Sequence, residues 1–262
     1  MKASCCVDFH QLPLTQMLLG ESFHPGGVKL THNLALQTLI NRNSIVLDIA
    51  AGKCTSAHYV ADNFGATVFA LDLGLDHLRH GKDENTRFNR DKMHFIQGDA
   101  EHLPIASNSI DVVLCECALC TFDDRDSALT EIYRVLKPRG YIAISDVFLN
   151  ERLPVELNIE LNRWLCISGA YNAIRNQDII AQGGFYQLRF RDVSASLLET
   201  IHTIEKKLTV PDPALSALIH QQTQLQAQQQ QSGWQHGIPR RLAHFIYDGG
   251  AGYYTLTARK PG

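Results

Sequence analysis

The chain lacks the features that suit a protein to nucleic acid or to a membrane. Its 24 lysines and arginines are outnumbered by 27 acidic residues, so no basic surplus is available for a phosphate backbone. No run approaches the roughly 18 to 20 uninterrupted apolar residues that cross a bilayer, and the first ten residues lack the basic and then apolar order of a signal peptide. We therefore expect a cytoplasmic protein that binds no nucleic acid and no membrane.

A disulfide pattern is also missing. The chain has seven cysteines in 262 residues, an odd number at irregular spacing, which favours free thiols in a reducing compartment. One Cys-x-x-Cys pair, Cys117 and Cys120, has no second pair to complete the four ligands of a structural zinc. We predict one compact domain without a structural metal.

Short apolar runs alternate with helical stretches through the middle of the chain. The runs are β-branched and apolar on both faces, which is typical of strands in a parallel sheet covered by helices. They lie at 44–50, 66–72, 93–98, 110–115 and 141–147. Apolar residues at helical spacing predict helices from near Lys29 and at 55–63, 75–87 and 125–136. The alternation predicts an α/β fold with right-handed crossovers.

The remainder of the chain continues with both kinds of element. We expect helices at 154–167, 175–182 and 196–208, and strands at 185–193 and 253–258. Residues 221–231 are rich in glutamine, and they fit either a solvated helix or an irregular excursion.

The loop after the first apolar run predicts a ligand with a cationic group. Open parallel sheets bind ligands beyond the carboxyl ends of their strands. Here the loop runs from Asp48 to Cys54, and small residues at 50–52 allow its backbone to approach a ligand closely. A carboxylate at Asp48 would repel a pyrophosphate but attract an ammonium group.

Two more carboxylates end the next two strands. Asp72 follows Asp48 by 24 residues, the spacing at which an acidic side chain accepts hydrogen bonds from ribose hydroxyls. Asp99 ends the third run, where it would reach the exocyclic amine of adenine. Each carboxylate alone also fits a turn or a helix cap. Three at consecutive strand ends favour a cationic nucleoside as the ligand.

Five stretches between residues 44 and 148 resemble the successive motifs of class I S-adenosylmethionine-dependent methyltransferases. They read VLDIAAG at 46–52, ALD at 70–72, GDAEHLP at 98–104, NSIDVV at 108–113 and EIYRVLKPRG at 131–140. The third and fifth look most like the small-molecule branch that contains ubiquinone, menaquinone and arsenite methyltransferases. The resemblance implies a Rossmann-like seven-stranded sheet, mostly parallel with an antiparallel last strand, and helices on both faces.

The resemblance also implies different roles for three segments of the chain. Residues 1–43 would form a lid or cap, 44–150 the core that binds S-adenosyl-L-methionine, and 151–262 the acceptor-side helices and the strands that complete the same domain. Carried over by position, the donor-binding residues are Asp48, Ala50 and Gly52 near the methionine end, Asp72 at the ribose, Asp99 at the adenine amine, Leu73 and Ala100 beside the adenine ring, and Cys115 at the end of the fourth strand.

The first loop departs from the family pattern, which has glycine where this chain has Ala50 and Cys54. We expect a negative φ at Ala50, because a positive φ disfavours residues with a Cβ. The cysteine likewise predicts that position 54 does not need a positive φ.

Methyl transfer from a sulfonium is an in-line displacement, so alignment of the acceptor counts for more than a large set of catalytic groups. His24 lies in the turn Phe23-His24-Pro25-Gly26-Gly27, and its imidazole would accept a proton from a thiol or hydroxyl. A plain helix-capping turn fits these residues equally well. We expect Phe23 and Tyr171 at the acceptor site, since aromatic faces attract a sulfonium, although core packing also suits Tyr171.

Cys120 and Cys166 are the remaining candidates for contact with the acceptor. The stretch that begins at Cys166 resembles the segment in which arsenite methyltransferases place one metalloid-binding cysteine. No later cysteine follows it, and Ala57 and His58 stand where the family has another. Arsenite methylation therefore requires Cys117 or Cys120 as a substitute ligand. Both candidate thiols also fit as buried apolar groups.

We predict an S-adenosylmethionine-dependent methyltransferase that acts on a small soft nucleophile, a thiol or hydrosulfide in preference to arsenite or a quinone-like ring. A nicotinamide-dependent oxidoreductase is a rival, but the loop after the first strand lacks its Gly-x-Gly-x-x-Gly turn. A second rival is an inactive scaffold that keeps the pocket as a relic. Retention of all three carboxylates argues against the scaffold. Oligomeric state is left open.

Overall fold

The computed structural model describes residues 13–20, 24–84, 90–155, 157–158, 169–210, 212–219 and 237–262. Two predicted acceptor-site residues, Phe23 and Cys166, lie outside the described residues. The glutamine-rich stretch at 221–231 and most of the predicted helix at 154–167 lie outside them as well.

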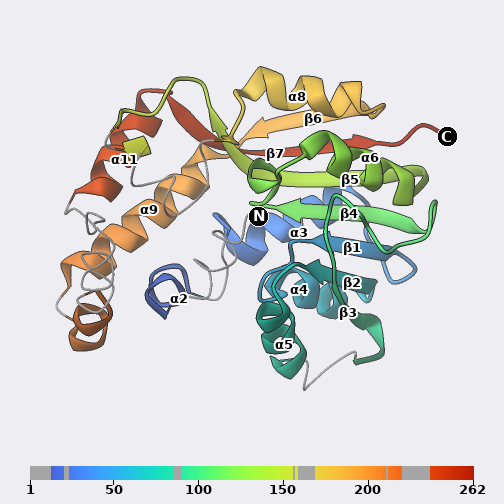
Figure 1. Cartoon of the computed structure of the whole chain (residues 1–262), viewed down its shortest axis with the longest axis horizontal. Helices are drawn as coiled ribbons and strands as arrows, with labels where there is room; N and C mark the ends of the chain where they lie inside the picture. The colour runs from blue at the N-terminus through green and yellow to red at the C-terminus, as the bar shows by residue number, and fades with distance from the viewer. Residues whose placement is uncertain are drawn as a thin grey trace.

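A single sheet organises the molecule (Figure 1). Its seven strands follow the order β3-β2-β1-β4-β5-β7-β6. They are β1 (Ile45–Ile49), β2 (Thr67–Asp72), β3 (Met93–Gln97), β4 (Ile110–Glu116), β5 (Leu136–Leu149), β6 (Tyr186–Asp192) and β7 (Ala251–Arg259). The pairs among β1 to β5 are parallel, whereas β7 runs antiparallel to both β5 and β6. The predicted mostly parallel sheet with an antiparallel last strand is confirmed.

Helices cover both faces of the sheet. The described helices include α2 (Pro13–Leu19), α3 (Gly27–Gln37), α4 (Thr55–Phe64), α5 (Leu75–Glu84), α6 (Arg125–Val135), α8 (Ala173–Gln182), α9 (Ser194–Thr209) and α11 (Ile238–Tyr247), with short 3-10 turns η1 (Arg90–Lys92) and η2 (Leu119–Thr121). Side chains alternate between the faces of a strand. In β1, accordingly, Val46 packs with residues of α3, α4 and α5, whereas Leu47 packs with residues of α6 and α8.

Two smaller apolar clusters lie beyond the main layers. One joins α9 and α11 to the end of β5 and to β7, and the other joins α2 to α9. In Figure 1, α9 and α11 extend away from one end of the sheet. Lys207 of α9 donates hydrogen bonds to the carbonyl oxygens of Met17 and Leu18, both at 2.9 Å, and so holds the end of α2.

The predicted elements agree closely with the observed ones, apart from a few differences that include an unpredicted helix at 213–219. The sequence patterns did not single out α2 or α11, and β5 begins at Leu136, five residues before the predicted start at 141. The described helices include none long and apolar enough to span a bilayer.

Candidate active site

Three carboxylates lie on one face of the sheet at its carboxyl edge. Asp48 pairs in register with Ala70 of β2 and Leu114 of β4. Two residues further along each neighbouring strand, on the same face, stand Asp72 and Glu116. All three are buried, with exposed fractions of 2%, 6% and 9%. The register therefore gathers the acidic groups under α3 and the start of α4.

Asp48 is the most constrained of the three. Burial raises the pKa of this carboxyl well above its ordinary value, and the nearby charges of Glu116 and Asp72 raise it further, whereas the backbone N–H of Ala57 opposes the shift. Among the described residues no group forms a hydrogen bond with its Oδ2. A buried carboxylate oxygen without a partner is costly, so this position fits a cationic or hydrogen-bond-donating group from a ligand.

The loop after β1 corrects two expectations. Ala50 has φ 57° and Cys54 has φ 63°, so both residues occupy the left-handed region and the predicted absence of a positive φ is wrong at each. The chain reverses sharply between β1 and α4, with a backbone hydrogen bond from Cys54 to the carbonyl of Ala51 at 2.8 Å. This turn requires the left-handed conformation even though the side chains carry a Cβ.

Asp72 fixes the loop from the neighbouring strand. Its Oδ2 accepts a hydrogen bond from the Gly52 N–H at 2.8 Å, and its Oδ1 accepts one from the Gly74 N–H at 2.7 Å. His77 of α5 lies 3.5 Å from the same Oδ1. Leu73, directly after β2, is 49% exposed. An exposed leucine next to Asp72 offers an apolar surface to a flat ring.

Asp99 follows β3 in a turn of its own. Its Oδ1 accepts a hydrogen bond from the Glu101 N–H at 2.9 Å, and its Oδ2 lies 3.9 Å from His102. Ala100 is buried. The ligand atoms of Asp99, Glu101 and His102 lie within 4.8 Å of one another, but partly exposed acidic groups of this kind are common without an ion, and we assign none.

His24 lies beside Glu116 at the carboxyl edge of the sheet. It is held there by Ser56, Thr31 and Glu116, which the sequence did not single out. Its Nδ1 lies 3.7 Å from Glu116 Oε1, and its Nε2 is 3.1 Å from the Ser56 hydroxyl. The Thr31 hydroxyl is 3.2 Å from Ser56 Oγ and donates to Glu116 Oε2 at 3.1 Å. Residues from α3, α4 and β4 thus form one hydrogen-bonded network around His24.

Glu116 carried a signal in the sequence that could have revealed it. It is an acidic residue at the end of a buried apolar strand, as Asp72 is at the end of β2. Thr31 and Ser56 gave no comparable signal, because each lies inside a helix, and Thr31 meets Glu116 and Ser56 meets His24 only in the folded chain.

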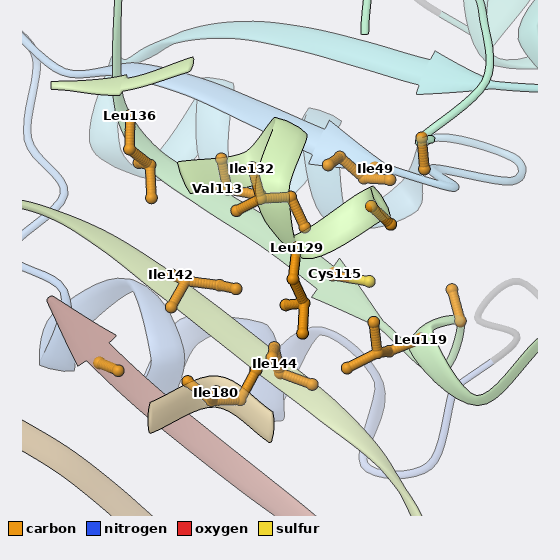
Figure 2. Packing of buried hydrophobic residues seen from close by; sticks show 14 of the residues in the cluster. Ile49, Val113, Cys115, Leu119, Leu129, Ile132, Leu136, Ile142, Ile144 and Ile180 are labelled. Atoms are coloured by element: carbon orange, nitrogen blue, oxygen red, sulfur yellow. The ribbon is translucent and has the colours of Figure 1, made fainter. Parts of the chain in front are cut away.

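Cys115 lies on the opposite face of the sheet. Figure 2 shows it among Ile49, Leu119 and Leu129 in the main hydrophobic cluster, and its exposed fraction is 0%. Its thiol therefore packs in the core. A contact with the donor stays a prediction, and it would have to come from the backbone.

Cys120 is the central residue of η2, and it is buried against Asp146 of β5. Its N–H donates to Asp146 Oδ2 of β5 at 2.7 Å. Burial raises the pKa of the Cys120 thiol well above its ordinary value, and the Asp146 carboxylate adds to the shift. Burial, with a further contribution from Asp146, raises the pKa of the neighbouring Cys117 thiol to about 12. Both thiols are therefore protonated at neutral pH.

Tyr171 lies between two guanidinium groups at the end of β5. Its carbonyl accepts a hydrogen bond from the Leu149 N–H at 3.1 Å. The Arg125 guanidinium lies 4.3 Å from the ring centroid and that of Arg175 lies 5.6 Å from it. Arg125 also donates to the carbonyl of Cys120 at 2.8 Å. Arg125 thus links Tyr171 and Cys120, two of the predicted acceptor-site residues, at one edge of the sheet.

Comparison with known proteins identifies the domain. Residues 47–144 match the family model described as "Methyltransferase domain". An arsenite methyltransferase from Aquipseudomonas alcaligenes is 29% identical over 181 residues, which cover 65% of this chain and 52% of that protein. A demethylmenaquinone methyltransferase from Renibacterium salmoninarum is 41% identical over 101 residues, 38% of this chain and 40% of that protein. These matches span about half or less of each relative.

Solved structures share the fold over nearly the whole chain. Phosphoethanolamine N-methyltransferase 2 of Haemonchus contortus, in complex with S-adenosyl-L-methionine, gives a TM-score of 0.77 at 18% identity and covers 97% of this chain and 60% of that one. The [4+2]-cyclase SpnF gives 0.75 at 21% identity and covers 97% and 93%. The fold alone therefore does not fix the reaction. The family match covers residues 47–144, and the chain as a whole shares its fold with a phosphoethanolamine N-methyltransferase and with a cyclase.

Proposed function

We propose that the protein transfers the methyl group of S-adenosyl-L-methionine to a small nucleophile. The observation that carries the proposal is the buried Asp48, whose Oδ2 lacks a partner among the described residues at the head of the loop of a methyltransferase domain. An ammonium group supplies the charge and the donors that this oxygen needs. A nicotinamide dinucleotide presents a pyrophosphate at this loop instead, which Asp48 would repel.

The remaining predicted contacts follow the same edge of the sheet. Gly52 and Ala50 would approach the methionine end, and Asp72 would accept hydrogen bonds from the ribose through the lone pairs that the loop leaves free. Leu73 offers its exposed side chain to the adenine ring. Asp99, with Ala100 beside it, would accept a hydrogen bond from the exocyclic amine.

S-adenosyl-L-methionine supplies a methyl group on a positively charged sulfur, and the new bond to the acceptor forms as the old bond to that sulfur breaks. The chain has to align the acceptor, exclude water and take up the acceptor's proton. We assign proton uptake to His24, whose buried ring is fixed by Ser56 and Glu116. Alignment of the reacting atoms alone supplies roughly 7 to 11 kcal/mol in favourable cases.

A thiol or hydrosulfide is the acceptor that we propose. The free thiol pKa of about 8.5 is close enough to that of an imidazole, about 6.5, for proton transfer, whereas an aliphatic hydroxyl is a far weaker acid. Tyr171 and Cys120 would line the acceptor site beside Arg125. Phe23 and Cys166 are proposed for the same site, although both lie outside the described residues.

Arsenite is the second candidate, because arsenite methyltransferases are among the relatives. Arsenic binds thiolates, and the raised pKa values of Cys117 and Cys120 oppose thiolate formation. The demethylmenaquinone methyltransferases favour C- or O-methylation of a quinone-like ring as a third. The buried, protonated thiols place arsenite below a soft sulfur acceptor.

The test is incubation with donor labelled in its methyl group and a panel of hydrosulfide, methanethiol, arsenite, phenols and a quinol. We expect label in volatile methyl sulfides, lost in Asp48→Asn and kept in Asp111→Asn. Asp111 is a matched control, because it pairs with Lys137 at the start of β4, away from the carboxyl edge. If the label appears in methylated arsenic or in a methylated quinol, that compound is the acceptor and the sulfur acceptor is wrong. Transfer to protein or nucleic acid alone would contradict the proposal.

A further inference from the structure

Asp48 and Glu116 form a pair of buried carboxylates. The proposed function gives Asp48 a contact with the donor but gives Glu116 none. They share one face of the sheet at the ends of adjacent strands, and their side chains are almost inaccessible to water. Glu116 accepts hydrogen bonds from Thr31 and lies 3.7 Å from His24. Asp48 accepts one from Ala57. Burial and the nearby charge of Glu116 both oppose the ionisation of Asp48.

The unpartnered oxygen of Asp48 marks the place where a positively charged ligand group would offset the charges of the two carboxylates. Oδ2 of Asp48 is buried and has no hydrogen-bond partner among the described residues, although the backbone N–H of Ala57 donates to the same carboxylate. An ammonium group donates three hydrogen bonds in different directions. One positive group near Asp48 can therefore satisfy that oxygen and offset the charge of both carboxylates.

We propose that Glu116 is a donor-binding residue, which completes with Asp48 a two-carboxylate site for the ammonium group of S-adenosyl-L-methionine, and that the pair releases a proton as that group binds. This inference rests on the proposed function. Without ligand, burial and the nearby charge of Glu116 favour the protonated form of Asp48. The arriving cation stabilises both ionised carboxylates, and the proton leaves to solvent.

Other titratable groups surround the pair and define what must be controlled. Around Asp48 these are Asp72 of β2, Cys115 of β4 and Cys54 before α4, with His77 of α5 beside Asp72. Around Glu116 they are His24 before α3, Cys117 after β4 and Tyr253 of β7. Burial and nearby carboxylates raise the pKa values of the three thiols, so they stay protonated. The two histidines face Glu116 and Asp72 respectively, so His24→Ala and His77→Ala report whether either supplies the proton.

Calorimetry in buffers of different ionisation enthalpy tests the inference directly. Binding is measured at pH 6, where the ligand's amino group is fully protonated, in phosphate and in Bis-Tris. We expect S-adenosylmethionine and S-adenosylhomocysteine to release protons in equal amounts, because both carry the ammonium group. 5′-Methylthioadenosine lacks it and should bind without release. At pH values below the pKa of Asp48, the affinity for both ammonium ligands should increase about tenfold for each unit by which the pH is raised.

Glu116→Gln separates a binding role from a structural one. It removes one negative charge, so we expect roughly tenfold weaker binding of S-adenosylhomocysteine and a clearly smaller proton release. Affinity for 5′-methylthioadenosine should stay unchanged, which also shows that the variant is folded. Asp111→Asn should match the wild type in every measurement.

The outcomes distinguish this inference from the proposed function. Donor binding and methyl transfer without proton release, or unchanged S-adenosylhomocysteine binding by Glu116→Gln, would overturn the two-carboxylate site and leave the activity intact. Release that persists in Asp48→Asn, or that disappears in His24→Ala or His77→Ala alone, would assign the proton elsewhere and overturn it too. Failure of the wild type to bind any of the three ligands would remove both proposals.

Discussion

At the residue scale, the strained loop after β1 is the feature least expected from the sequence. Ala50 and Cys54 hold left-handed backbone conformations, which cost a residue with a Cβ about 1 to 2 kcal/mol. The loop keeps these conformations because Asp72 and the start of α4 fix both of its ends. Strain at the point of closest approach to a ligand is typical of binding loops.

Glycine at position 50 should relieve part of this strain. We expect Ala50→Gly to raise the free energy of unfolding by about 0.5 to 1 kcal/mol, because the lost steric penalty exceeds the added chain entropy of glycine. Urea denaturation measures the change. Ala51→Gly is the matched control, since Ala51 has no positive φ, and it should lower stability by a similar amount. A loss of stability in Ala50→Gly would show that the alanine side chain contributes packing we have not counted.

The proposed base gives a second prediction at this scale. His24→Ala should lower the rate of methyl transfer to a thiol by roughly 10² to 10⁴, the usual contribution of a positioned acid or base. Donor affinity should change little, because the predicted donor contacts lie on the strand ends. Single-turnover rates with saturating donor separate the two quantities. Thr31→Ser keeps a hydroxyl beside Glu116 and should retain most activity. An unaltered rate in His24→Ala would reduce His24 to a structural residue.

At the element scale, the packing of α5 against the first loop depends on the absence of a side chain at Gly81. A Cβ there would lie 2.5 Å from Cys54 Sγ and 2.8 Å from Cys54 Cβ. Helix propensity favours alanine over glycine by about 1 kcal/mol, but contacts this short force α5 or the loop to move. The position therefore links the placement of a helix to the conformation of the loop after β1.

We expect Gly81→Ala to destabilise the fold by roughly 1 to 3 kcal/mol, the range for overpacked sites. Thermal or urea unfolding gives the value. Cys54→Gly removes both close atoms and also suits the left-handed φ at position 54, so in the double variant the loss should be much smaller than in Gly81→Ala alone. Additive effects would show that α5 does not press on the loop.

At the scale of the whole molecule, the four cysteines within the described residues serve the core and not the surface. Three are buried, and Cys117 is partly so. Burial raises the pKa of each, with nearby carboxylates adding to the shift, to about 12 for Cys117. A thiol reacts as the thiolate, so folding suppresses the reactivity of all four together.

Alkylation therefore reports global unfolding. We expect iodoacetamide at pH 7 to leave Cys54, Cys115 and Cys120 unmodified in the native protein and to modify them only as urea unfolds the chain, as followed by peptide mass spectrometry. Raising the pH to 8.5 should have little effect in the native state, because the thiols stay protonated, whereas free cysteine as a control reacts faster. Rapid native labelling at Cys120 would show that the acceptor edge opens locally.

The resemblance to class I methyltransferases implied the antiparallel last strand. The sequence by itself determined the succession of strands and helices along the chain and the acidic residues at the strand ends. These are local properties, because an apolar run, a helical spacing and a carboxylate after a strand can each be read from neighbouring residues. It did not reveal α2 or α11, whose apolar faces are decided by packing against α9 and β7.

Only the tertiary structure decided how the site is assembled. Thr31, Ser56 and Glu116 are far apart in the chain, and register between β1 and β4 together with the packing of α3 and α4 brings them to His24. The same register places Cys115 on the core face, away from Asp48. The left-handed φ at Ala50 and Cys54 is likewise imposed by the elements that hold the loop. Such features depend on contacts between distant segments, and no local pattern encodes those contacts.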